Sequence, residues 1–115
     1  MTILTKQISL SVLKGEHCRA FSTLTKAVVD IDKGVMAVDA ELHADQEEML
    51  LQDGSRQESL WGINLYPDRS REDFIEYTSL INIRPRENNM SMEVESEDIR
   101  QKVRDVVFSL VNFDA

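Results

Sequence analysis

Glu41, His43 and Asp45 occupy alternate positions at the end of a segment, Met36 to Ala44, in which apolar and polar residues alternate. This alternation is typical of a half-buried β-strand, where every second side chain points to the same face. The three side chains would then follow one another about 6 to 7 Å apart. Such a row can hold a divalent metal ion if a neighbouring strand adds a ligand, and an open coordination position would support metal-assisted hydrolysis. In the simpler interpretation, His43 only hydrogen-bonds near the strand end and Asp45 caps the next helix.

A second group of polar residues suggests a ligand-binding surface at one end of the predicted sheet. Its arginine would pair with a carboxylate or a phosphate. The structural alternative is that the polar residues after Gln52 satisfy backbone groups in an irregular connection. The candidate ligand-binding residues are Asp53, Ser55, Gln57, Asn64, Asn82 and Arg84.

Other catalytic patterns are missing from the sequence. There is no nucleophile elbow, phosphate-binding loop, metal finger or dinucleotide fingerprint. The single cysteine, Cys18, cannot form an internal disulfide and lacks the partners for a structural zinc site. We therefore predict no cofactor, with a divalent metal ion at the Glu41, His43 and Asp45 row as the one alternative.

Length and composition indicate one domain over residues 1–115 with an ordinary soluble composition, 42% hydrophobic and 30% charged. No apolar run approaches the roughly 20 residues that span a bilayer, so we expect no membrane insertion. The first residues lack the pattern of a secretory signal, so we expect a cytoplasmic location. The net charge of −8 opposes binding to phosphate backbones, so we do not expect nucleic acid as a partner.

Two neighbouring segments, residues 26–32 and 36–44, predict a hairpin. If Asp32 faces Val35 across a two-residue turn, Val29 pairs with Val38 and every apolar side chain meets another. Lys33 is a poor residue for such a turn, which favours a bulge there. Two further strands are predicted at residues 60–66 and 74–84, and Trp61 in the first of them belongs to the core face.

Three helices are predicted around this sheet. Ser9 is a plausible N-cap for the first, although Ile8, Leu10 and Val12 also fit a short strand. Residues 45–52 form the second, which ends at Asp53-Gly54. Ser96 caps the third, whose apolar residues recur at helical spacing through Val111 and predict packing on the sheet.

These elements predict an α+β fold with an antiparallel sheet of about four strands and helices packed on one face. The other face would then be wet or partly covered by a second subunit. Val28 and Leu80 are apolar among its polar residues, which favours a homodimer.

The chain resembles a family of short uncharacterised bacterial proteins, a domain of unknown function. The most specific part of the resemblance runs from Glu41 to Asn64, through Leu50-Leu51-x-Asp53-Gly54-Ser55-x-Gln57-x-x-Leu60-Trp61-Gly62-x-Asn64, and Asn82-Ile83-Arg84-Pro85 adds to it. The family implies no activity. It tends to carry arginines around Asn89-x-Ser91, where this chain has Met90 and Met92, so an anion-binding role of that loop does not follow.

The leading hypothesis from the sequence is a non-catalytic module that binds a ligand or partner and self-associates. The alternative is a small metal-dependent hydrolase that uses Glu41, His43 and Asp45.

Overall fold

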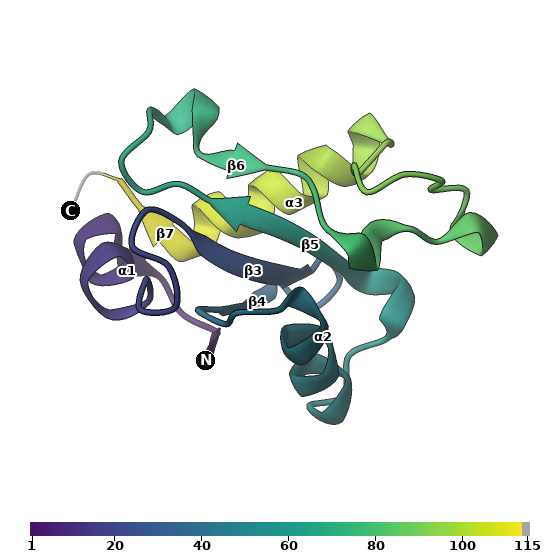
Figure 1. The fold of residues 1–115 in the computed structure, drawn as a ribbon, viewed down its shortest axis with the longest axis horizontal. Coiled ribbons are helices and arrows are strands. Elements are labelled where there is room, and N and C mark those ends of the chain that lie inside the picture. The colour runs from purple at the N-terminus through teal and green to yellow at the C-terminus, as the bar shows by residue number, and fades with distance from the viewer. Residues whose placement is uncertain (114–115) are drawn as a thin grey trace.

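The structure, a computed structural model, describes residues 1–113. Its sheet is formed by the strands β1 (Thr2–Leu4), β4 (Val35–Val38), β3 (Thr25–Asp30), β5 (Leu60–Leu65) and β6 (Ile75–Glu76), in that order and antiparallel throughout. The helices are α1 (Leu10–Glu16), α2 (His43–Gln52) and α3 (Glu97–Leu110). A short parallel pair joins β2 (Ile8–Ser9) to β7 (Val111–Asn112). Figure 1 shows the three helices around the central strands of the sheet. The predicted α+β class with an antiparallel sheet is confirmed.

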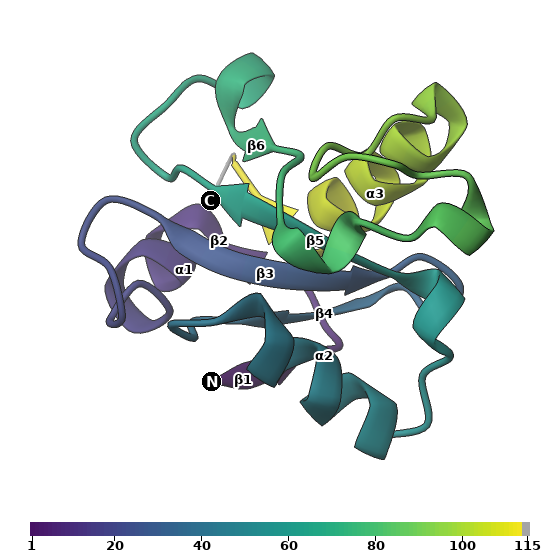
Figure 2. The same cartoon turned by 45° about the vertical axis from the view of Figure 1, so that its right-hand side comes forward.

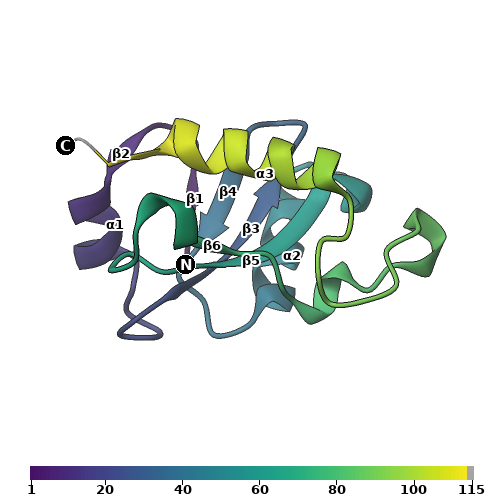
Figure 3. The same cartoon turned by 90° about the horizontal axis from the view of Figure 1, so that it is seen from above.

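Helices lie on both faces of the sheet (Figure 2). One face packs its alternate residues, including Val29, Met36 and Trp61, against Val103 and Val107 of α3. Seen from above, α3 lies across the strands (Figure 3). The helix has the predicted Ser96 cap, which accepts a hydrogen bond from the backbone nitrogen of Ile99.

The other face, which we had expected to be wet or covered by a second subunit, is covered by α2. Leu50 and Leu51 of this helix pack with Val28, Ala37 and Leu60 of the sheet. Val28 is therefore fully buried within its own chain. This removes half of the argument from sequence for a homodimer, because Val28 needs no second subunit to cover it.

The hairpin forms in a register two residues away from the predicted one. Val29 pairs with Met36 and Ala27 with Val38, so Asp30 faces Val35 across a four-residue connection. The carboxylate of Asp30 accepts hydrogen bonds from the backbone nitrogens of Asp32 and Lys33, which explains the longer turn. A shift by two residues keeps the same side chains on each face.

The prediction of a strand from Met36 to Ala44 is wrong beyond Val38. Asp39 has a positive φ of 65°, and its carboxylate accepts hydrogen bonds from the backbone nitrogens of Arg19 and Ala20. The chain turns there, and α2 already begins at His43. The predicted cap is also wrong, because Leu42 stands at the N-cap position and Asp45 lies in the first turn.

The predicted strand over residues 74–84 is reduced to the two residues of β6. Beyond it the chain forms an irregular segment with the 3-10 helices η3 (Leu80–Asn82) and η4 (Pro85–Glu87). We call residues 78–95 the arm. Among residues 1–113, no helix has the length and apolar content needed to cross a bilayer.

Candidate functional site

The structure separates the three residues of the predicted metal site. Glu41 is exposed in the turn before α2, His43 is buried at the start of that helix, and Asp45 is exposed in its first turn. The shared strand face on which the hypothesis depended does not exist. Within the described residues, no group of three or more histidine, cysteine or acidic side chains is placed to hold a metal ion.

The six candidate ligand-binding residues lie at four places. Asp53 and Ser55 follow α2, where the Ser55 hydroxyl donates to the carboxylate of Asp30 over 2.6 Å. Gln57 and Arg84 meet at the start of β5. Asn64 lies at the other end of that strand, and Asn82 is buried beside its middle. They are therefore spread over the fold, and the side chains of Asn82 and Arg84 hydrogen-bond the backbone.

Arg84 is occupied by the fold. Its guanidinium donates to the backbone oxygens of Gln57 and Leu60, pairs with Glu87 at 3.2 Å and lies 4.1 Å from the centre of the Trp61 ring. Its side chain is only 10% exposed. Arg84 therefore fixes the start of β5 to the arm, and it has little surface left for a carboxylate or phosphate ligand.

Asn82 takes the place of a neighbouring strand beside β5. Its Oδ1 accepts from the backbone nitrogen of Gly62 over 2.8 Å, and its Nδ2 donates to the backbone oxygens of Gly62 and Met92 over 2.9 and 3.0 Å. Because β6 pairs only with Asn64 and Leu65, Gly62 would otherwise have no partner on that side. The side chain of Asn82 thus continues the sheet and anchors the arm.

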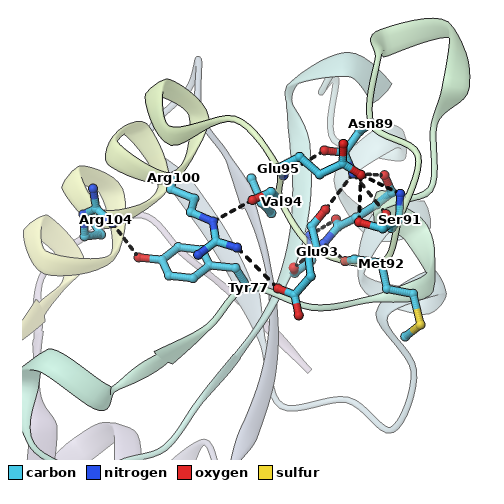
Figure 4. A network of polar contacts seen from close by, with 11 residues as sticks. Tyr77, Asn89, Ser91, Met92, Glu93, Val94, Glu95, Arg100 and Arg104 are labelled. Atoms are coloured by element: carbon cyan, nitrogen blue, oxygen red, sulfur yellow. Dashed lines mark hydrogen bonds and ion pairs between the residues drawn. The ribbon is translucent and has the colours of Figure 1, made fainter.

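Asn89 and Glu95 hold the far part of the arm (Figure 4). Asn89 Nδ2 lies 2.7 Å from the backbone oxygens of both Asn82 and Glu93, and its Oδ1 accepts from the backbone nitrogen of Glu95. The Glu95 carboxylate accepts from the backbone nitrogens of Met90 and Ser91 and from the Ser91 hydroxyl. The hydrogen bond from Ser91 lowers the pKa of Glu95.

The anchored arm and the start of α2 enclose a hollow of about 260 Å³. Its polar lining includes Lys26 and Asn64 from the sheet, His43 from α2 and Thr78 from the arm. Its apolar lining is Leu42, Ala44, Leu80, Ile81 and Met92.

Three large apolar side chains form the rim of the hollow and are unusually exposed to solvent. Leu80 is 71% exposed, Leu42 56% and Met92 41%. In Figure 4 the side chain of Met92 extends away from the polar network that holds its backbone. Clustered exposed apolar side chains around a concavity are typical of binding sites. Sequence reasoning missed this site, since it joins residues from the start of α2 to residues about forty positions later.

His43 lies in the wall of the hollow with only 8% exposure. Its Nε2 is 2.7 Å from the backbone oxygen of Ile63, which can only accept, so Nε2 carries the hydrogen of the neutral ring. Asn64 is fixed nearby because its Nδ2 donates to Glu76 over 2.7 Å. Its buried Oδ1 has no hydrogen-bond partner in the described part of the chain. Burial is the main cause that lowers the pKa of His43, while the hydrogen bond to the backbone oxygen of Ile63 acts in the opposite direction.

The lowered pKa of His43 predicts a loss of stability in acid. The unfolded chain protonates this ring near its ordinary pKa of about 6.5, and the folded chain only at a lower pH. The contribution of the neutral ring is therefore complete above about pH 6.5 and is lost as the pH falls through the folded-state pKa. We expect His43→Gln to flatten this part of the curve of unfolding free energy against pH, measured with urea. If the curves of the two proteins stay parallel between neutral pH and about pH 5, the pKa of His43 is not lowered by folding.

Comparison with known proteins identifies a family but supplies no activity. No curated protein and no solved structure matches this chain. The family model described as "Protein of unknown function (DUF5674)" matches residues 2–110, and the chain therefore belongs to this family.

Proposed function

We propose that this protein is a non-catalytic module that binds a protein partner through the hollow between α2 and the arm. The observation that carries the proposal is the exposed apolar rim formed by Leu42, Leu80 and Met92. Burying one such side chain fully contributes about 1.5 to 3 kcal/mol, so three of them suffice as the centre of a binding site.

The rigidity of the arm supports the same proposal. Asn82 and Asn89 donate hydrogen bonds to the backbone of the arm that carries Leu80 and Met92, and Glu95 accepts one from it. A surface that is already ordered loses less conformational entropy when a partner binds. Met92 and the neighbouring Met90 have flexible, polarizable side chains that adapt to a partner's surface.

Self-association through this surface is the second candidate, and Leu80 is the observation that favours it. The sequence singled out Leu80 as an apolar residue in need of cover, and the structure leaves it 71% exposed. A homodimer formed around Leu80 would bury this side chain without any other protein.

Site-specific photocrosslinking in cells that naturally produce the protein tests the proposal. A photoreactive phenylalanine analogue replaces Leu80 in one variant and the exposed Lys102 of α3 in the control. We expect a discrete covalent adduct from position 80 alone, and we expect Leu42→Ser with Met92→Ser to reduce it by about tenfold. An adduct of twice the chain's mass identifies the homodimer. Equal or absent crosslinking at the two positions would contradict the proposal.

A further inference from the structure

We infer that the segment which fills the hollow is basic and amphipathic, with apolar side chains flanked by lysines or arginines. This inference rests on the proposed function and names the chemistry of the partner. Its starting point is the sequence order around the rim. Glu41 immediately precedes Leu42, Asp45 follows Ala44, and Glu93 follows Met92.

These acids differ in how far the fold already neutralises them. Glu93 forms an ion pair with Arg100 over 3.4 Å. Glu41 and Asp45 are exposed, and neither forms an ion pair with another described residue. Glu41 precedes the lining residue Leu42 and Asp45 follows the lining residue Ala44, so they are the open carboxylates that flank this part of the lining in the chain.

Within the described residues, the lining of the hollow holds one lysine, Lys26 of β3, whose Nζ lies 5.5 Å from the centre of the Phe21 ring and whose charge also acts on His43. Outside this lining, the two open carboxylates beside Leu42 and Ala44, on a chain of net charge −8, give the α2 edge of the hollow a negative charge. Such an edge attracts and orients a positively charged segment.

The same charges oppose a second copy of this chain as the occupant. A contact between two copies through their hollows would place the open carboxylates of Glu41 and Asp45 from both copies at or beside one interface. Like charges across an interface cost binding free energy. A segment with lysines or arginines beside its apolar residues satisfies both the apolar rim and the acids.

Fluorescence anisotropy with model peptides tests the inference. The probe is a labelled helical peptide of leucine and lysine with all leucines on one face. The comparison peptides are its scrambled sequence and its counterpart with glutamate in place of lysine. We expect the leucine and lysine probe to bind at least about tenfold more tightly than either comparison peptide, and to weaken as salt is added.

Matched charge reversals locate the effect on the protein. Glu41→Lys with Asp45→Lys is expected to weaken binding of the leucine and lysine probe by about tenfold. The control is Asp98→Lys with Asp105→Lys on α3, which makes the same change in net charge. Asp98 lies in the first turn of α3 as Asp45 lies in the first turn of α2, so both pairs place a lysine in the first turn of a helix. We expect less than about a twofold effect from this control. Equal weakening by both pairs, or no binding of the probe, would overturn the inference.

Leu80→Ser separates the failure of the inference from the failure of the proposed function. If the glutamate peptide binds as well as the lysine peptide and Leu80→Ser weakens both, the hollow binds apolar segments and only the charge preference is wrong. If the lysine peptide binds but Leu80→Ser leaves its affinity unchanged, binding occurs elsewhere, and both proposals fail.

Discussion

Asn82→Ala is expected to destabilise the fold by about 3 to 5 kcal/mol. The substitution leaves the backbone nitrogen and oxygen of Gly62 and the backbone oxygen of Met92 without the partners that Asn82 provides. Each buried polar group left without a partner costs about 1 to 3 kcal/mol. Urea unfolding measures the change in stability, and amide hydrogen exchange at Gly62 reports the loss of its hydrogen bond.

Asn82→Asp provides a test with the same side-chain shape. Aspartate keeps an acceptor for the backbone nitrogen of Gly62 but cannot donate to the two backbone oxygens when ionised. We expect it to be as damaging as alanine at neutral pH. Gln101→Ala on the exposed side of α3 is the control, with a change within about 0.5 kcal/mol. A loss below 1 kcal/mol for either Asn82 variant would show that the arm does not depend on this side chain.

Gly62→Ala is expected to destabilise the fold by about 3 kcal/mol. A Cβ atom at this fully buried position would lie 2.5 Å from Cβ and 2.6 Å from Oγ of Ser79, and 3.0 Å from a side-chain carbon of Ile81. Cβ of Ser79 cannot move without its backbone, so the start of η3 would have to shift away from β5. Overpacking in a closed core costs about 1 to 3 kcal/mol, and backbone displacement places this case at the upper end.

Gly15→Ala is the matched control for that substitution. Gly15 lies within α1, and a Cβ atom there would meet nothing within 4 Å. Alanine is favoured over glycine inside a helix by up to about 1 kcal/mol, so this variant should be more stable than the wild type. Thermal melts of both variants compare the two effects. A Gly62→Ala protein as stable as the wild type would contradict the close packing of η3 on β5.

Both predictions concern the contact that positions the binding surface. Gly62 allows the arm to approach β5, and Asn82 forms the hydrogen bonds that this approach permits. Leu80 lies between Ser79 and the Ile81-Asn82 pair, so it is held at the edge of the hollow from both sides. The position of the apolar rim thus follows from a glycine and an asparagine that are far apart in the sequence.

Elements with a local signal could be predicted from the sequence. The cap at Ser96 and the repeated apolar residues that follow it define α3 within one residue of its observed end. Residues 60–66 contain all of β5, and Trp61 is in the core with 1% exposure. In both cases the helix or strand preference of the local sequence agrees with the final structure.

The failures arise where distant contacts override the local pattern. The alternation of residues 36–44 is that of a strand, but Asp39 accepts hydrogen bonds from backbone groups about twenty residues earlier and turns the chain. The strand expected at residues 74–84 ends because the side chain of Asn82 pairs with Gly62 in its place. The short strands β2 and β7 form only because residues 8 and 111 meet.

The candidate site shows the same limit. The sequence offered Asn82 and Arg84 as candidate ligand-binding residues, whereas in the structure their polar groups bind the backbone of β5 and the arm. His43 and Asn64 do line the hollow, where neither the metal hypothesis nor the ligand hypothesis had combined them. The exposed Leu42 and Met92 carried no signal in the sequence, because an apolar residue predicts burial until the fold shows that nothing covers it.

Methionine oxidation provides the most direct test of the central claim that a partner covers the hollow. Met36 is fully buried and Met49 does not line the hollow, so they serve as internal references beside Met92. Peroxide treatment is compared between the purified protein and the same protein inside cells that naturally produce it, with mass spectrometry of each methionine. We predict that Met92 oxidises readily in the purified protein and is protected in cells, relative to Met49. Equal oxidation of Met92 in both samples would contradict the account.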